Sequence, residues 1–314
     1  MKKIAVIVPA YNEEVLIEKT INSIPKKVNK IVIINDCSKD NTKMIVESLA
    51  KENNKIELIN FEKNSGVGAT LIAGYEYCYE NKFDIAVVMP GDAQALPVDF
   101  DNLIEPVLNG TADYSKGNRL KHHNVKEIMP KHRFIGNTFL TILTKFASGY
   151  FHIMDPQMGY TALNVSILEK VNIRNLIKRY GYPGQLLFLL NMVDAKVVDV
   201  EVTPHYDIEK SGIRLTTFVP KLMFLLVKLF VQRVMKKLLK EKMSPAGISY
   251  FFCFGMFIAF VALSSRSLYY YFSFGYIPGL TFMAFLTSMM LFFIFFFFGV
   301  MFDYQENQKI HSDI

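Results

Sequence analysis

The chain has 314 residues, of which 51% are hydrophobic, and a formal net charge of +6. This length provides for one large domain, or for one domain with an appendage. The cysteines Cys37, Cys78 and Cys253 lie far apart, which excludes zinc-finger and disulfide-framework spacing and is typical of a reducing compartment. We find no RNA-recognition motif, and therefore expect no nucleic-acid partner.

Short apolar runs alternate with helical patterns from Lys2 to about Val202. The runs predict strands at residues 4–8, 30–34, 56–61, 85–89 and 199–204. The helical patterns begin near Asn12, Lys39, Val67 and Pro97. The first run is too short for a signal peptide and is typical of a strand. Strands separated by helices predict βαβ units, and so an α/β domain with a mostly parallel central sheet.

A basic amphipathic helix is predicted at residues 220–243, after a linker or flap at 206–217. Its apolar residues recur at helical spacing and are Leu222, Met223, Leu225, Leu226, Leu229, Phe230, Val234, Leu238 and Leu239. Its basic residues are Lys221, Lys228, Arg233, Lys236, Lys237, Lys240 and Lys242. Such a helix lies on a membrane surface, or packs on a soluble domain with its charged face in water; the apolar segments that follow favour the membrane.

Two later segments are long and apolar enough to span a bilayer, which takes roughly 20 residues per helix. They lie at 247–263, extending to 271 if Arg266 sits at an interface, and at 277–302, which carries no charge. The alternative is a buried helical hairpin in a soluble core. Basic residues beside the spans favour a cytoplasmic side there.

We therefore expect a head at 1–215, an interfacial helix at 216–244, two transmembrane helices at 245–303 and a cytoplasmic tail at 304–314. This describes a multi-pass protein of the cell membrane whose head is in the cytoplasm. Homo-oligomerisation through the spans stays open.

Polar residues follow the predicted strands where each strand ends. The run at 85–89 breaks into Pro90-Gly91-Asp92-Ala93-Gln94, and the earlier runs lead into Glu13, Asp36 and Gly66. The carboxyl edge of a parallel sheet is where such folds bind phosphates and metals. Carboxylates suit the N–H groups of a base and the hydroxyls of a ribose, and glycines allow close approach of a ligand. Taken singly, each residue also fits a helix cap or a turn.

The series as a whole resembles the family 2 glycosyltransferases of the GT-A fold, in the dolichol-phosphate mannosyltransferase-like branch. The resemblance covers nearly the whole head, and the following spans match members that anchor their own head. It rests on Val8-Pro9-Ala10-Tyr11-Asn12-Glu13-Glu14, Asn35-Asp36-Cys37-Ser38, Asn64-Ser65-Gly66-Val67-Gly68, Gly91-Asp92-Ala93-Gln94, Gly117-Asn118-Arg119, Gly159-Tyr160 and Glu209-Lys210-Ser211-Gly212-Ile213-Arg214.

The resemblance implies a donor site for a GDP- or UDP-linked sugar. Its residues would be Pro9, Tyr11, Glu13, Asp36, Gly66, Asp92, Ala93 and Gln94, with Lys210 and Arg214 in a basic loop over the diphosphate. Asp92 and Gln94 would hold a divalent cation, Mg²⁺ or Mn²⁺. The chain departs from the family at Pro90, where members commonly carry the first acid of Asp-x-Asp.

The resemblance also implies an acceptor site for a polyprenyl phosphate such as dolichyl or undecaprenyl phosphate. Arg119, Arg133 and Asn137 would receive the phosphate, and Asp92, Arg119 and Arg133 would be catalytic; the alternative for Arg133 is a surface charge. The ionised phosphate needs no general base, and the transfer would invert the anomeric centre. Asp155 orients acceptor or sugar, or caps a turn.

Two other functions remain open at this stage. One is a family 2 glycosyltransferase that acts on a saccharide or a glycerolipid. The other is a non-catalytic nucleotide-binding membrane module, which the missing acid at Pro90 would favour.

Overall fold

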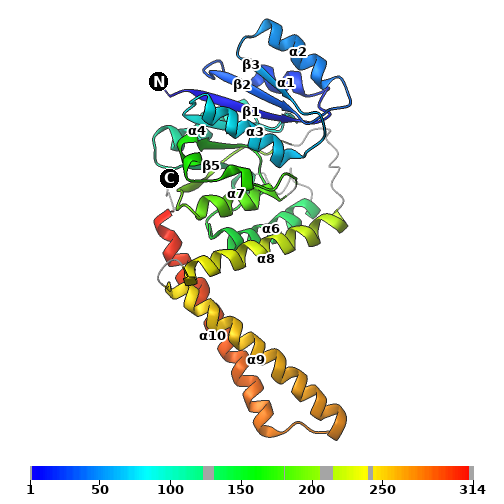
Figure 1. The fold of residues 1–314 in the computed structure, drawn as a ribbon, viewed down its shortest axis with the longest axis vertical. Coiled ribbons are helices and arrows are strands. Elements are labelled where there is room, and N and C mark those ends of the chain that lie inside the picture. Colours follow the sequence, from blue (N-terminus) through cyan, green and yellow to red (C-terminus); the bar gives the residue numbers. More distant parts are fainter. Residues whose placement is uncertain (1, 123–130, 180, 206–214, 240–242, 311–314) are drawn as a thin grey trace. The chain divides into compact units, whose positions relative to one another are not determined.

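A seven-stranded sheet organises the first part of the chain in the computed structural model, in the order β3-β2-β1-β4-β6-β5-β7 (Figure 1). The strands are β1 (Ile4–Ala10), β2 (Lys30–Asn35), β3 (Ile56–Asn60), β4 (Ile85–Val88), β5 (Tyr114–Asn118), β6 (Thr161–Asn164) and β7 (Val197–Glu201). The structure describes residues 2–122, 131–179, 181–205, 215–239 and 243–310. Within these ranges the side chains of residues 131–135, 137 and 215–218 are not described.

The predicted mostly parallel α/β sheet is confirmed. Strands β1 to β4 pair in parallel, as do β5 and β7, whereas β6 runs antiparallel to both of its neighbours. The sequence patterns predicted neither β5 nor β6. Strand β5 carries a lysine and an asparagine, and β6 is only four residues long, so neither shows the apolar run that marks the other strands.

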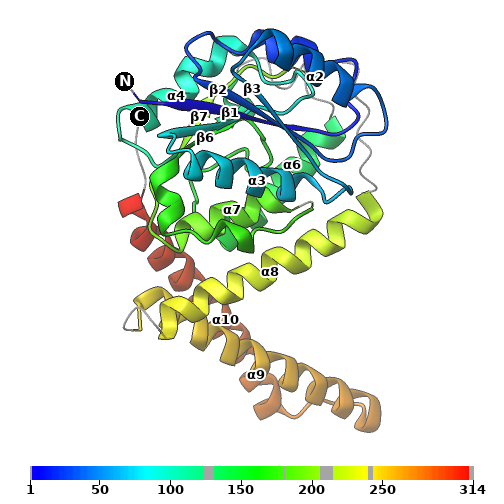
Figure 2. The same cartoon turned by 45° about the horizontal axis from the view of Figure 1, so that its top comes forward.

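Helices cover both faces of this sheet (Figure 2). One face packs on α1 (Ile17–Ser23), α2 (Thr42–Glu52) and α4 (Phe100–Leu108), the last preceded by η1 (Pro97–Asp99). The other packs on α3 (Val67–Glu80) and α7 (Tyr182–Asn191). Along β1 the buried side chains alternate, with Val6 and Val8 in the first core and Ala5 and Ile7 in the second.

Two helices begin later than their sequence patterns predict. Asn12 adopts φ 58, and its side-chain oxygen accepts a hydrogen bond from Lys39 N at 2.9 Å, so α1 starts only at Ile17. Asp40 accepts from Thr42 N at 3.0 Å, which places the start of α2 at Thr42. The short helices η2 (Arg119–Lys121), η3 (Val165–Glu169), η4 (Ile173–Asn175) and η5 (Gln308–Ile310) fill connections.

The predicted amphipathic helix is observed as α8 (Leu215–Leu239), which starts before Pro220 and includes it. Its buried residues Leu222, Leu226 and Leu229 pack with Leu140 of α6 (Lys131–Ser148) and Phe188 of α7. One face of α8 therefore packs on protein, as the alternative reading of the sequence holds. A second, exposed stripe is also apolar and consists of Phe224, Val227, Val231, Met235 and Leu239.

The chain forms two compact units, Met1–Leu229 with Ile310–Ile314, and Phe230–Lys309. The second contains α9 (Pro245–Phe274) and α10 (Gly279–Asn307). Ser244 caps α9 by accepting from Gly247 N at 3.1 Å, and Gly275 ends it at φ 75. Stacked pairs Phe252 with Phe295 and Phe260 with Phe285 show that the two helices run antiparallel.

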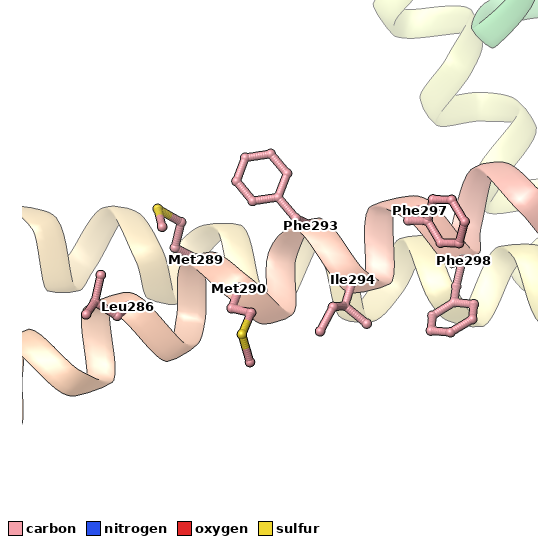
Figure 3. Close-up of a pocket in the computed structure, with 7 residues that line it drawn as sticks. All are labelled: Leu286, Met289, Met290, Phe293, Ile294, Phe297 and Phe298. Carbon is pink, nitrogen blue, oxygen red and sulfur yellow. The ribbon is translucent and has the colours of Figure 1, made fainter.

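Both α9 and α10 are long and apolar enough to cross a membrane. Their side chains are mostly exposed within the described residues, unlike those of a core hairpin in a soluble protein. Figure 3 shows an open pocket along α10, whose lining is apolar throughout. Its lining residues are Leu286, Met289, Met290, Phe293, Ile294, Phe297 and Phe298.

A buried ion pair lies at the end of α10 inside the second unit. Arg233 of α8 donates to Asp303 through both terminal nitrogens, each at 2.6 Å, and both side chains are almost wholly buried. Lys237 donates to Glu306 at 2.6 Å and lies 3.3 Å from Asp303. The prediction that Arg233 and Lys237 belong to a solvated or membrane-facing charged surface is therefore wrong, because α10 supplies carboxylates for both.

The variant Arg233→Met should destabilise the second unit by about 3–5 kcal/mol, because it leaves a buried carboxylate without its bidentate partner. Thermal unfolding of the purified protein in detergent measures the loss. The double variant Arg233→Met/Asp303→Leu should recover most of it, since both charges are then removed. Arg266→Met is the control, because Arg266 is exposed and stacks on Tyr270. An Arg233→Met protein as stable as this control would contradict the prediction.

Candidate active site

The carboxyl ends of β1, β2 and β4 meet at one edge of the sheet, and backbone hydrogen bonds join the loops that follow them. Asp36 N donates to Ala10 O at 2.9 Å, and Gly91 N donates to Pro9 O at 3.2 Å. The structure thus brings together the turns that carry Asp36 and Asp92, both predicted to bind the nucleotide-sugar. These turns lie on either side of the end of β1.

Asp36 is tied to the glycine loop that precedes α3. Its two carboxylate oxygens accept from Ser65 N at 2.6 Å and from Gly66 N at 2.8 Å, and the residue is only 3% exposed. The sequence assigned Asp36 to the nucleotide, and the structure adds a structural role. A carboxylate has about four lone-pair positions, so these two bonds leave it able to accept from a ligand.

The glycines at the start of α3 are required by the packing of the chain itself. A Cβ at Gly68 would lie 1.9 Å from Ile177 O, and one at Gly66 would lie 2.6 Å from Lys178 O. Ala69 N donates to Lys178 O at 3.0 Å, so the segment at 177–179 already covers part of this helix amino end. Close approach of a ligand is thus not the sole reason for glycine here, and nucleotide binding at Gly66 stays a prediction.

The loop after β1 presents Tyr11 and Glu13 at the same edge. Tyr11 is 41% exposed and Glu13 is half-buried. Asn12 N donates to Ser38 Oγ at 3.0 Å and Glu13 N to Thr42 Oγ1 at 2.8 Å, which fixes this loop to the one after β2. An aromatic ring and a carboxylate on a fixed loop can stack on a base and accept its N–H groups.

The turn after β4 holds Asp92 in a half-buried position. Asp92 Oδ1 accepts from Gln94 N at 3.0 Å, and Ala93 between them adopts φ 55. One carboxylate and one amide oxygen fit a cation that takes its other ligands from phosphate and water. Among the described residues no group of three or more His, Cys, Asp and Glu side chains gathers as a metal site.

The sequence reading missed Tyr182, which lies behind this turn. A Cβ at Gly159 would lie 3.0 Å from Pro90 Cγ and 3.6 Å from the Tyr182 hydroxyl, so Pro90 and Tyr182 both pack against that glycine. Burial raises the pKa of Tyr182 to about 12, and the charge of Asp92 adds to the rise. Pro90 therefore contributes packing rather than a metal ligand. Nothing in the sequence indicated that Tyr182 lies near Asp92, because it showed only a single tyrosine in a helical pattern.

Arg119, just after β5, is held by Asp155. Its Nε donates to Asp155 Oδ2 at 2.8 Å and its Nη2 to Asp155 Oδ1 at 3.2 Å. The Asp155 side chain is fully buried and that of Arg119 is 13% exposed. The sequence offered two interpretations of Asp155, as a turn cap or as a group that orients a substrate. The observed bond differs from both, because Asp155 orients the protein's own arginine.

The remaining predicted residues lie, wholly or with their side chains, outside the described part of the chain. Arg133 and Asn137 lie on α6, but their side chains are outside the described residues, as are Lys210 and Arg214 altogether. Their assignment to the acceptor phosphate and to the diphosphate stays a prediction.

Comparison with known proteins identifies the family of this chain. Residues 5–172 match the model of glycosyl transferase family 2. A UDP-N-acetylglucosamine–dolichyl-phosphate N-acetylglucosaminyltransferase of Methanococcus voltae is 31% identical over 218 residues, covering 65% of this chain and 86% of that protein. An undecaprenyl-phosphate mannosyltransferase of Micrococcus luteus is 23% identical, covering 64% of this chain and 83% of that protein.

Solved structures confirm the predicted GT-A fold. Glucosyl-3-phosphoglycerate synthase of Mycobacterium tuberculosis, solved with Mn²⁺ and uridine diphosphate, superimposes with a TM-score of 0.55 at 18% identity. The alignment covers 74% of this chain and 80% of that one. The family model spans more than half of the chain, and the Methanococcus voltae relative is matched over most of its length. The chain therefore belongs to glycosyl transferase family 2 and is a glycosyltransferase.

Proposed function

We propose that this protein moves a sugar from a GDP- or UDP-linked donor to a polyprenyl phosphate, such as dolichyl or undecaprenyl phosphate, at the cytoplasmic face of the cell membrane. The observation that carries the proposal is the joining, in one chain, of a family 2 glycosyltransferase head to two helices long enough to cross a membrane. Relatives that are named as dolichyl-phosphate and undecaprenyl-phosphate sugar transferases support this acceptor.

The donor would bind over the carboxyl ends of β1, β2 and β4. Tyr11 and Glu13 would receive the base and Asp36 the ribose, and hydrogen bonds hold the loops that carry them to one another. Pro9, Gly66 and Ala93 would line the site, and Lys210 and Arg214 would close over the diphosphate. Because these loops are fixed before the donor arrives, little ordering is needed when it binds.

Asp92 and Gln94 would hold a divalent cation, Mg²⁺ or Mn²⁺, together with oxygens of the donor diphosphate and water. When bound, the cation would offset the negative charge that builds on the leaving nucleoside diphosphate. The Mn²⁺ in the Mycobacterium tuberculosis synthase supports this role for the fold. The hydrogen bond from Gln94 N to Asp92 sets the two side chains in one turn.

The acceptor phosphate would be received by Arg119, Arg133 and Asn137. A phosphate monoester is ionised near neutral pH, so its oxygen can attack the anomeric carbon without a general base. The protein would then contribute position and positive charge, and a single displacement would invert the anomeric centre. Asp155 fixes Arg119 for this purpose through a bidentate bond.

The membrane part would follow the domain plan that the sequence predicts, with 1–215 catalytic, 216–244 interfacial, 245–303 spanning and 304–314 returning to the cytoplasm. The exposed apolar stripe of α8 suits the headgroup boundary of a bilayer, and Lys221 and Lys228 are exposed near it. Association of copies through the spans would fit the uncovered apolar surface of α10.

Liposomes that contain the purified protein and polyprenyl phosphate should form a lipid-soluble labelled product from one of the labelled donors UDP-glucose, UDP-N-acetylglucosamine or GDP-mannose. Asp92→Ala should lower this transfer by about a hundredfold or more, because the proposed site loses the carboxylate that would hold the cation. Asp101→Ala is the control, since Asp101 is exposed and pairs with Lys27 at the surface.

Other products would identify other functions. Label in a saccharide or a glycerolipid would favour those acceptors over a lipid phosphate. Tight donor binding without turnover would favour the non-catalytic nucleotide-binding module. Unchanged transfer by Asp92→Ala would show that this turn is not the metal site.

Removal of divalent cations with EDTA should abolish transfer, and Mg²⁺ or Mn²⁺ should restore it. Gln94→Ala should raise the metal concentration for half-maximal rate by about tenfold, because one of two protein ligands is lost. Its rate at saturating metal should stay close to that of the unaltered protein. Full activity after complete chelation would contradict the assignment of Asp92 and Gln94.

A further inference from the structure

The segment 154–158 carries Asp155, the partner of Arg119, and is tied down at both ends by charged side chains from the sheet. Met154 N donates to Asp199 Oδ2 of β7 at 2.7 Å. At the other end, Lys116 Nζ of β5 donates to Met158 O at 2.5 Å. Because β5 and β7 pair in parallel, both ties start from one rigid pair of strands.

Asp199 also holds the backbone on both sides of Arg119. Its Oδ2 accepts from Asn118 Nδ2 at 2.7 Å, and Asn118 Oδ1 accepts from Leu120 N at 2.9 Å. Asn118 and Leu120 are the two chain neighbours of Arg119. One carboxylate therefore fixes both the backbone that bears the arginine and the segment that bears its partner.

This arrangement is costly for the fold, which argues for a purpose beyond stability. Lys116 is 1% exposed and Asp199 is 9% exposed, and Asp199 Oδ1 has no hydrogen-bond partner in the described part of the chain. Burial lowers the pKa of Lys116 to about 8, against the pull of Asp155 and Asp199, and raises the pKa of Asp199 to about 6. Buried ionisable groups with perturbed pKa values cluster at functional sites.

We infer that Asp199 and Lys116 are positioning residues that set the direction of the Arg119 guanidinium by clamping the segment 154–158 from both ends. Nε and Nη2 of the guanidinium both donate to Asp155, so the position of Asp155 bears directly on the plane of the fork. This inference rests on the proposed function, in which Arg119 receives the acceptor phosphate. A bidentate phosphate contact depends on the direction of that plane.

The experiment uses the full-length protein in liposomes, with the donor found active above and polyprenyl phosphate of fixed chain length. Asp199→Ala should raise the KM for the lipid phosphate by about tenfold, because a displaced arginine loses phosphate contacts. The KM for the donor should stay unchanged. Asp199→Asn should restore the lipid KM to within about threefold, since an amide oxygen can still accept from Met154 N and Asn118.

A double variant tests whether Asp199 acts through Arg119. Asp199→Ala should lower kcat/KM by no more than about twofold when added to Arg119→Ala, because the residue it positions is already gone. If the two residues act independently, their effects will multiply. Asp113→Ala is the matched control, because Asp113 accepts from Lys196 N at 2.9 Å at the opposite end of the same two strands. It should leave the lipid KM unchanged.

Lys116→Met provides a second test in case Asp199→Ala fails to fold. It removes the bond at the other end of the segment 154–158 and keeps the side-chain bulk. It should raise the lipid KM in the same direction, with the donor KM unchanged. An unaltered lipid KM in both Asp199→Ala and Lys116→Met, or a multiplicative double variant, overturns the inference. Failure of the proposed function would look different, because the unaltered protein would then form no sugar-linked lipid phosphate from any donor.

Discussion

Helices cover both faces of the central sheet, and this constraint decides where a ligand can reach the sheet. One face packs on α1, α2 and α4 and the other on α3 and α7, and both cores are apolar. Ligand groups are therefore confined to the ends of the strands, as in other parallel sheets. Asp36 and Asp92 each follow a strand that is buried throughout its last residues. Backbone bonds between neighbouring strand ends then hold these turns together, so the site depends on strand pairing before it depends on any side chain.

The parts of this structure that the sequence predicts are those that local patterns specify. Uninterrupted apolar runs predict β1 to β4, and the long uncharged stretches predict α9 and α10. The bond between Arg119 and Asp155 joins residues 36 positions apart and leaves no periodic trace, so the sequence offered two readings of Asp155 and neither was this one. For the same reason Lys116, Asp199 and Tyr182 were missed, because each gains its meaning from neighbours on other strands and helices.

Helix α8 shows why a basic amphipathic pattern does not specify what its faces contact. Its apolar residues divide between one face packed on α6 and α7 and another that is exposed. Its basic residues divide as well, since Arg233 and Lys237 are buried against α10 while Lys221 and Lys228 stay exposed. A helical period fixes which residues share a face, but only partners distant in sequence, here Asp303 and Glu306, decide whether a charge is solvated or paired.

In the proposed function, where Arg119 receives the acceptor phosphate, the pairing of Arg119 with Asp155 has a consequence for binding. A buried carboxylate cancels much of the positive charge of the arginine, so attraction at long range is weakened. What the pair retains is direction, because the fork is held in one plane before the acceptor arrives and loses little side-chain entropy on binding. On this proposal the site would discriminate by geometry, and it would favour a phosphate presented at a fixed height and angle over one that diffuses freely. A lipid phosphate is held by its own membrane in such a presentation. In the proposed function, the bond between Arg119 and Asp155 and the apolar helices α9 and α10 would both serve the recognition of a lipid phosphate.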